Sequence, residues 1–229
     1  MTDVLELREF TAPLYTQREA ADLVGVPDST FHHWARGYVY KSIDGTQRSS
    51  SALVTTTGLG RGPVVPFVGL GEAYVLAAFR RAGVPMQRIR PAVEWLESRI
   101  GLRAALTSEQ LKTDGAELLW DFGGTGAAGH AVADDLVVVR NQQAVFREVV
   151  EQHLSTITYR DGRLVAIRLP RWSTPVVLDP AVNFGQPTLA GRGVRLADVR
   201  DRLSAGEPAT DVAEDYGLPL ADVRALAAA

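Results

Sequence analysis

The side chains best suited to binding chemistry lie together near the N-terminus, in residues 15–37, YTQREAADLVGVPDSTFHHWARG. Phe31 and Trp34 are three residues apart, a spacing that places both on one face of a helix. The opposite face then carries polar groups that can reach base edges and phosphates. These outward residues are Asp28, Ser29, Thr30, His32, His33 and Arg36. The segment therefore predicts a surface that reads DNA.

Two short helices joined by a tight turn would position this surface. Thr16 can cap the first helix, and Glu19 completes a capping box with it. Gly25 suits the left-handed residue that ends a helix, and Pro27 can begin the next one. We predict a helix-turn-helix whose first helix adds two more DNA contacts, Gln17 and Arg18. The alternative is a helical hairpin that is packed within a domain and binds nothing.

The segment after Gly37 predicts a β-wing. It is rich in Ser, Thr and Gly and holds two candidate strands, residues 39–43 (VYKSI) and 63–68 (PVVPFV), around a basic loop. A wing beside a recognition helix lies along the DNA backbone, so its basic residues would contact phosphates. The candidate contacts are Tyr38, Lys41, Arg48 and Arg61. A disordered loop is the alternative.

Composition excludes several classes of protein. The 229 residues are 46% hydrophobic, yet no apolar run approaches the roughly 20 residues of a membrane span, and the acidic N-terminus is not a secretory signal. We therefore expect a cytoplasmic protein without membrane contact. Cysteine is absent and the four histidines lack ligand spacing, so no metal or cofactor is expected. The sequence contains no paired acid and base and no cofactor-binding loop, so it gives no indication of an enzyme.

The distribution of charge separates the two ends of the chain. The overall net charge of −3 gives no support for nucleic-acid binding. Residues 26–69 hold four basic and two acidic side chains, and residues 72–103 hold six and three. Residues 207–229 hold one basic and five acidic side chains. A basic front half and an acidic tail indicate different partners for the two ends.

The middle of the chain predicts helices, a connector and a small mixed module. Residues 70–81 and a second helix from Pro85 are amphipathic, with a kink expected at Pro91. Glycine-rich residues 107–135 form a flexible connector. A strand (136–140), a helix (143–154) and a hairpin around Asp161 and Gly162, with arms at residues 155–159 and 164–169, then suggest a module that pairs with another chain.

The C-terminal segment repeats the core pattern of residues 15–37. After a proline-rich linker with one short strand, PVVLD, three helices are expected, interrupted at Gly206 and Gly217. Without gaps, Gly25-Val26-Pro27 aligns with Gly217-Leu218-Pro219, and Phe31 and Trp34 align with Val223 and Leu226. The exposed positions differ, because Ser29, Thr30, His32 and His33 become Ala221, Asp222, Arg224 and Ala225. DNA would repel the acidic residues around this copy, which predicts protein binding instead.

Two stretches resemble known families. Residues 14–100, with YTQREAADLVGVPDSTFHHWARG, a wing and LGEAYVLAAFRRAGVPMQRIRPAVEWL, resemble the winged helix-turn-helix of MerR-like DNA-binding proteins. Residues 176–229, with VLDP, FGQPTLAGRGV and LSAGEPATDVAEDYGLPLADVRAL, resemble small helical antitoxin domains. Together they look like a VapB-type antitoxin. That resemblance implies neutralisation of a PIN-domain ribonuclease toxin, repression of its own operon through operator DNA, and a homodimer within a toxin–antitoxin hetero-oligomer.

The residues that would contact the toxin are our own inference from the sequence. A cation inserted into the carboxylates of a PIN-type site, or an acidic tail that covers basic substrate-binding surface, could inhibit the toxin. The candidates are Arg171, Phe184, Arg192, Arg195, Asp211, Glu214 and Asp215. The loop FGQPTLAGRG could instead be a tight turn that packs onto the helices, and both interpretations stay open.

The expected fold is mainly α with small β elements. Its parts are a winged helix-turn-helix (1–103), a connector (104–135), a strand-helix-hairpin module (136–174) and a C-terminal helical domain resembling a helix-turn-helix (175–229). The alternative function is a MerR-like regulator that responds to a small molecule. It would place an apolar pocket around Trp120, Phe122 and Trp172.

Overall fold

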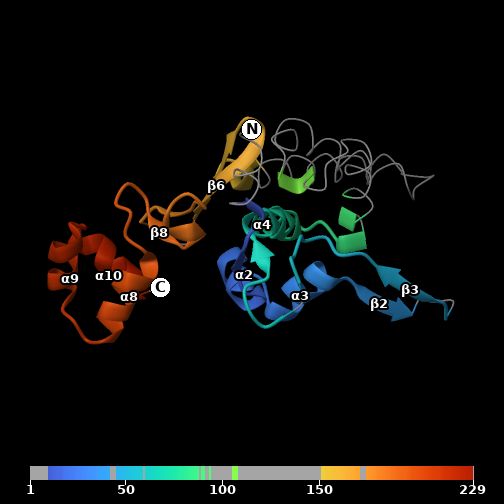
Figure 1. Ribbon diagram of the computed structural model, residues 1–229, viewed down its shortest axis with the longest axis horizontal. Coiled ribbons are helices and arrows are strands. Elements are labelled where there is room, and N and C mark those ends of the chain that lie inside the picture. Colours follow the sequence, from blue (N-terminus) through green and yellow to red (C-terminus); the bar gives the residue numbers. More distant parts are fainter. Residues whose placement is uncertain are drawn as a thin grey trace, which may run out of the picture. The chain divides into compact units, whose positions relative to one another are not determined.

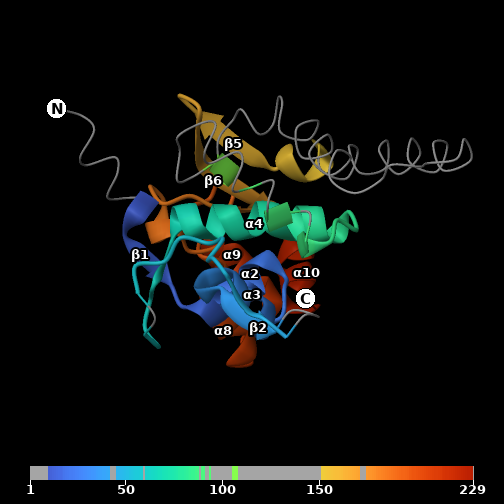
Figure 2. The same cartoon turned by 90° about the vertical axis from the view of Figure 1, so that its right-hand side faces the viewer.

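Helix α4 (Phe67–Arg81) lies at the centre of the N-terminal part of the chain. Almost every residue from Phe67 to Phe79 is buried, and a helix that is apolar all round belongs in a core. Figures 1 and 2 both show α4 running along one side of a pair of shorter helices, α2 and α3. The sequence pattern predicted a helix from Leu70 to Arg81. The helix in fact begins at Phe67, because β-structure ends at Pro66.

The computed structural model describes residues 10–41, 45–58, 60–87, 89–90, 93, 105–107, 151–170 and 174–228. They divide into two compact units. The first lies within residues 1–155 and 159–164, and the second within 156–158 and 165–229. Within the predicted connector, only the 3₁₀ helix η1 (Ala105–Thr107) is described. Several other expectations fall outside the described residues, namely the rest of the connector, the strand at 136–140, most of the helix at 143–154, the kink at Pro91, Arg171 and the pocket residues Trp120, Phe122 and Trp172.

The predicted helix-turn-helix is present. Helix α2 (Gln17–Val24) starts with the predicted capping box, since Glu19 N–H donates to Thr16 Oγ1 at 3.2 Å and Thr16 N–H donates to Glu19 Oε2 at 2.8 Å. Gly25 ends it in the left-handed conformation, with φ +74°. Helix α3 (Asp28–Arg36) follows, with Pro27 just before its first residue. These local signals acted as expected because each involves neighbours within one helical turn.

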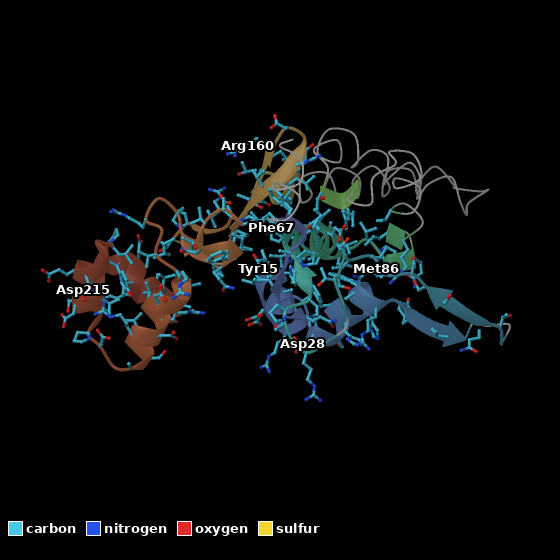
Figure 3. All side chains as sticks on the ribbon, viewed as in Figure 1. Tyr15, Asp28, Phe67, Met86, Arg160 and Asp215 are labelled. Atoms are coloured by element: carbon cyan, nitrogen blue, oxygen red, sulfur yellow. The ribbon has the colours of Figure 1, made fainter. Side chains whose placement is uncertain are left out.

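Strand β1 (Pro13–Tyr15) connects the start of the helix-turn-helix to the start of α4. It pairs antiparallel with β4 (Val65–Pro66), so that Tyr15 lies opposite Val65. Tyr15 at the end of β1 and Phe67 at the start of α4 are both buried, and Figure 3 labels both side chains within the first unit. Burial, and then the charge of Glu19, raise the pKa of the Tyr15 phenol far above its ordinary value.

The pairing of the wing differs from the prediction. Strand β2 (Tyr38–Lys41) pairs with β3 (Gln47–Ser50), whereas the predicted partner, residues 63–68, holds β4 and the start of α4. The β2–β3 hairpin extends away from the helices (Figure 1). Gln47–Ser50 is polar throughout, so it lacks the alternation of apolar residues by which a half-buried strand is identified in a sequence. The strand predicted at residues 39–43 is confirmed at 39–41, and residues 42–43 lie outside the described part of the chain.

The second unit contains most of a four-stranded sheet and three helices. The strands β5 (Ile157–Arg160), β6 (Arg163–Leu169), β7 (Val176–Leu178) and β8 (Thr188–Leu189) are ordered β5-β6-β7-β8. The predicted hairpin turn is confirmed, with positive φ at Asp161 (52°) and Gly162 (74°). Its tip, residues 159–164, groups with the first unit.

The three predicted C-terminal helices are also confirmed. They are α8 (Leu196–Ser204), α9 (Ala209–Tyr216) and α10 (Leu220–Ala228), and they surround a small apolar core (Figure 1). Val199, Val212, Val223 and Leu226 are completely buried in it. No helix in the described part of the chain is long and apolar enough to cross a membrane.

Residues 151–154 are helical and carry His153, whose ring stacks on Tyr74 of α4 with 4.1 Å between centroids. Burial, and then the charge of Arg81, lower the pKa of His153 from 6.5 to about 4. Between these values the unfolded chain binds more protons than the folded one. Stability should therefore be complete above pH 6.5 and fall as the pH drops towards 4.

We expect this loss to reach about 2 kcal/mol, a value discounted for the partial exposure of His153. Chemical denaturation at a series of pH values would measure it. His153→Phe keeps an aromatic ring against Tyr74 and removes the titrating group, so its stability should change less over the same range. An identical pH profile for both proteins would contradict the assignment to His153.

Candidate nucleic-acid interface

Helix α3 separates its buried and exposed residues as the spacing predicted. Phe31, Trp34 and Ala35 are buried against the rest of the first unit. Of the outward set, Thr30 is half-buried, and the others are exposed, namely Asp28, Ser29, His32, His33 and Arg36. Figure 3 shows Asp28 at the outer edge of this unit. The helix thus presents a polar face that contains two imidazoles and one guanidinium.

Helix α2 contributes to the same face. Gln17 Oε1 lies 3.1 Å from His32 Nδ1, so the first helix orients a side chain of the second. Arg18 is exposed next to Gln17. At Lys41 and Arg48 the structure describes the backbone of the wing strands, and the side chains lie outside the description. Arg61 is exposed in the turn before β4.

A row of rings joins α3 to the wing. The ring centroids of His32 and His33 are 6.4 Å apart, and those of His33 and Tyr38 are 5.4 Å apart. Arg90 lies over the Tyr38 ring at 5.3 Å, within the range of a cation–π contact. Its Nη1 also donates to the carbonyl oxygen of Ser51 at 2.6 Å. Arg90 therefore holds the base of the wing near the recognition helix.

The sequence pattern does not single out Arg90 as part of this surface. In the sequence, Arg90 is one of the six basic side chains of residues 72–103. The contact partners Tyr38 and Ser51 are far away in the sequence, so no spacing rule connects them. The excess of positive charge was the one available signal, and it did not single out a residue.

The wing is fixed to the end of α3 through its backbone. Gly37, which ends α3, has φ +69° and lies so close to β3 that a Cβ there would be 2.0 Å from the carbonyl oxygen of Ser50. The N–H groups of Leu53 and Val54 donate to the carbonyl oxygen of Trp34, at 2.8 and 3.1 Å. The orientation of the wing thus depends on the last turn of the recognition helix.

The loop after the wing is attached to α4 by a buried carboxylate. Glu72 is only 2% exposed, and it accepts hydrogen bonds from Thr55 N–H at 2.5 Å and Thr55 Oγ1 at 3.0 Å. A buried charge requires such partners. One turn earlier, Gly69 allows close approach, because a Cβ there would lie 2.1 Å from the carbonyl oxygen of Thr55. This contact anchors the loop that follows the wing to the core helix α4.

Arg81, at the end of α4, stabilises the turn between α2 and α3. Its Nη2 donates to the carbonyl oxygen of Val24 at 2.6 Å. A cation next to the C-terminus of a helix also interacts favourably with the helix dipole. A Cβ on Gly25 would approach this nitrogen to 2.9 Å, a contact that a shift of the Arg81 side chain can relieve, so the glycine is required for its left-handed φ of +74°. The turn is thus supported from α4.

The C-terminal copy reproduces the backbone of the helix-turn-helix. Val26 N–H donates to the carbonyl oxygen of Ala21 at 3.0 Å, and Leu218 N–H donates to that of Ala213 at 2.8 Å. Gly25 and Gly217 are both left-handed. Each unit therefore contains one copy of the same helix-turn-helix backbone. The prediction that the second copy binds protein concerns its surface, which this backbone likeness does not test.

The other C-terminal candidates lie in different settings. Phe184 and Arg192 are exposed on neighbouring loops, while Arg195 forms an ion pair with Asp198 at 2.6 Å.

Asp215 is 2.7 Å from Arg202, which also pairs with Glu207 and lies over the Tyr216 ring. Hydrogen bonding to Arg202 lowers the pKa of Glu207. Asp211 and Glu214 are exposed on α9.

Comparisons with known proteins match both ends of the chain. Residues 13–93 match the family described as "Putative DNA-binding HTH domain", and residues 176–228 match "Protein of unknown function (DUF433)". The chain is 46% identical to "Putative antitoxin VapB45" of Mycobacterium tuberculosis (strain ATCC 25618 / H37Rv) over 221 residues, 93% of this chain and 92% of that protein. It is 30% identical to "Uncharacterized protein Rv2308" of the same strain over 220 residues, 92% and 87% of the two chains.

A solved structure shares the architecture as well. The X-ray crystal structure of Rv2018 from Mycobacterium tuberculosis has 42% sequence identity and a TM-score of 0.76. The match covers 96% of this chain and 99% of that one. The likeness therefore extends over both units rather than over the helix-turn-helix alone.

The junction between α3 and the wing gives a matched pair of substitutions. Gly37→Ala places a Cβ against the carbonyl oxygen of Ser50 and should destabilise the protein by about 3 kcal/mol or more. Gly45, at the wing tip, has φ +80°, and the Cβ added by Gly45→Ala would meet no described atom within 4 Å. It should cost about 1 kcal/mol, from its left-handed backbone alone. Chemical denaturation compares the two variants, and equal losses would refute the close packing at Gly37.

Proposed function

The chain belongs to the family of the Mycobacterium tuberculosis protein named "Putative antitoxin VapB45", and from this kinship we propose that it is the antitoxin of a type II toxin–antitoxin system. The identity over more than nine-tenths of both proteins is the observation that carries the proposal. Such a chain is a regulator with two binding tasks, and it acts without catalysing a reaction.

The first task is to bind operator DNA through the N-terminal unit. The exposed face of α3 offers Ser29, His32, His33 and Arg36 for base edges and phosphates, and α2 adds Gln17 and Arg18. Thr30 is at the margin of this face. Tyr38, Lys41, Arg48 and Arg61 of the MerR-like wing and its flanking loop would contact the backbone. One recognition helix reads few bases, so a homodimer on a two-fold operator is part of the proposal.

The second task is to neutralise a toxin, which we propose is a PIN-domain ribonuclease. The residues that would contact it are those of the C-terminal set, Arg171, Phe184, Arg192, Arg195, Asp211, Glu214 and Asp215. Of the cations, Arg192 is exposed and Arg195 already pairs with Asp198. Arg192 is thus the better candidate for insertion among carboxylates. Repression and neutralisation would then depend on different surfaces of one chain.

Replacing residues of the recognition helix should weaken operator binding. Arg36→Ala and His33→Ala each remove a polar side chain from the exposed face of α3. Loss of a base contact would lower the affinity by about 1–3 kcal/mol, whereas loss of a phosphate contact by Arg36 would reduce the salt dependence by about one unit. Gel-shift titration of the DNA upstream of the gene, at several salt concentrations, measures both effects.

The internal repeat supplies a matched control. Arg224 occupies the position of α10 that corresponds to His32 in α3, and it is also exposed. Arg224→Ala removes the same charge as Arg36→Ala from the acidic copy, so it should leave operator affinity unchanged. If Arg224→Ala weakens binding as much as Arg36→Ala, the recognition helix has been assigned to the wrong copy.

Neutralisation is tested by co-expression with the product of the adjacent reading frame. The full chain should relieve the growth arrest that this product causes and should co-purify with it. Arg36→Ala and His33→Ala should do the same, because they alter the DNA-binding face only. An adjacent product that neither arrests growth nor co-purifies with the chain would refute the antitoxin proposal.

A further inference from the structure

The loop between β7 and β8 contains an aromatic residue in an unusual backbone conformation. Asn183, Phe184 and Gly185 are consecutive and left-handed, with φ of 48°, 53° and 74°. Asparagine and glycine adopt this conformation readily, whereas a bulky aromatic residue rarely does. Such strain persists only where the surrounding structure imposes it, and it is concentrated at functional sites.

Hydrogen bonds from two neighbouring segments hold this turn. Asn183 Nδ2 donates to the carbonyl oxygen of Gly193 at 2.9 Å and to Thr188 Oγ1 at 3.1 Å. Gly185 N–H donates to the carbonyl oxygen of Asp179 at 3.1 Å. The turn is therefore fixed at both ends before any partner arrives. A rigid anchor loses little conformational entropy when it binds.

The side chain that this turn presents faces solvent. Phe184 is 81% exposed, and Val182, two residues earlier, is 39% exposed. The apolar residues of the adjoining strands, Val176, Leu178 and Leu189, are almost completely buried. Burial of an aromatic side chain at an interface is among the largest single contributions to binding. The fold thus places a large apolar side chain in water although a core lies nearby.

We propose that Phe184, with Val182, is the anchor by which this chain docks onto the protein that it neutralises. The proposal rests on the antitoxin function proposed above. The partner surface that fits is an apolar socket edged by carboxylates. Arg192 supports the carboxylate edge, because it is exposed on the loop to which Asn183 is bonded through the carbonyl oxygen of Gly193.

A nucleic acid fits this site less well than a protein does. Binding to DNA or RNA requires several cations along a phosphate backbone. Arg195, the other arginine of this loop, is neutralised by its ion pair with Asp198. Two exposed apolar side chains, with the guanidinium of Arg192 on the loop that Asn183 contacts, match the composition of a protein-binding hot spot instead.

The strain gives a test in which stability and binding should change in opposite directions. Phe184→Asn and Phe184→Gly place residues that tolerate the left-handed conformation at this position. The midpoint of thermal unfolding should rise by about 2 °C for Phe184→Asn, and by less for Phe184→Gly, because a glycine also increases the conformational entropy of the unfolded chain. Affinity of the full chain for the purified product of the adjacent reading frame, measured by titration calorimetry, should fall at least tenfold.

Val39→Ser is the matched control. Val39 is 60% exposed on the wing strand β2, in the other unit, so its removal should leave this affinity unchanged. Operator affinity of the Phe184 variants, measured by gel shift, should also equal that of the unchanged protein.

Three results would overturn the inference. Unchanged affinity of Phe184→Asn for the partner, with binding by the unchanged chain intact, would refute the anchor while leaving the antitoxin proposal standing. A fall in unfolding temperature would show that Phe184 is there for packing. If Phe184→Asn changes the sedimentation coefficient of the chain measured without any partner, Phe184 contributes to self-association instead. If the unchanged chain does not bind the adjacent product at all, the antitoxin proposal itself fails.

Discussion

The contact between Thr55 and Glu72 is the constraint on which the rest of the N-terminal unit depends. A buried carboxylate is unfavourable unless hydrogen bonds compensate it, and Thr55 supplies two. Gly69 lets the backbone of Thr55 approach α4, which no side chain would permit. The adjoining residues Leu53 and Val54 bind the carbonyl oxygen of Trp34, so the recognition helix and the wing are oriented relative to the core by this one loop.

The polar surface is built on that frame from side chains contributed by separate segments. Gln17 of α2 contacts His32, His33 lies beside Tyr38, and Arg90 reaches back from beyond α4 to cover Tyr38. Each of these side chains is positioned by a contact with another segment, so the surface has a defined geometry. The backbone of the turn recurs at Gly217, where exposed Asp211 and Glu214 give a different surface. The two copies therefore share a backbone and differ in their outward residues.

The proposed tasks draw on different physical properties of the two units. DNA binding needs cations and donors on a rigid helix, which α3 and the wing supply. Capture of a protein needs an apolar anchor that loses its water on binding, and the proposed anchor is the exposed Phe184 on its strained turn. Because the two properties lie in separate units, a substitution in one should leave the other task intact. An autoregulating antitoxin requires such separation if the toxin is to be captured while the operator is occupied.

The sequence by itself determined the elements whose causes are local. The capping box at Thr16, the left-handed Gly25, the Asp161-Gly162 turn and the C-terminal helices each depend on residues a few positions apart. The tertiary structure decided the pairing of β4 with β1, the polar partner strand of the wing and the roles of Glu72 and Arg90. Those contacts join residues distant in the sequence, so no periodicity encodes them. The strain at Phe184 likewise arises only when the surrounding hydrogen bonds close its turn.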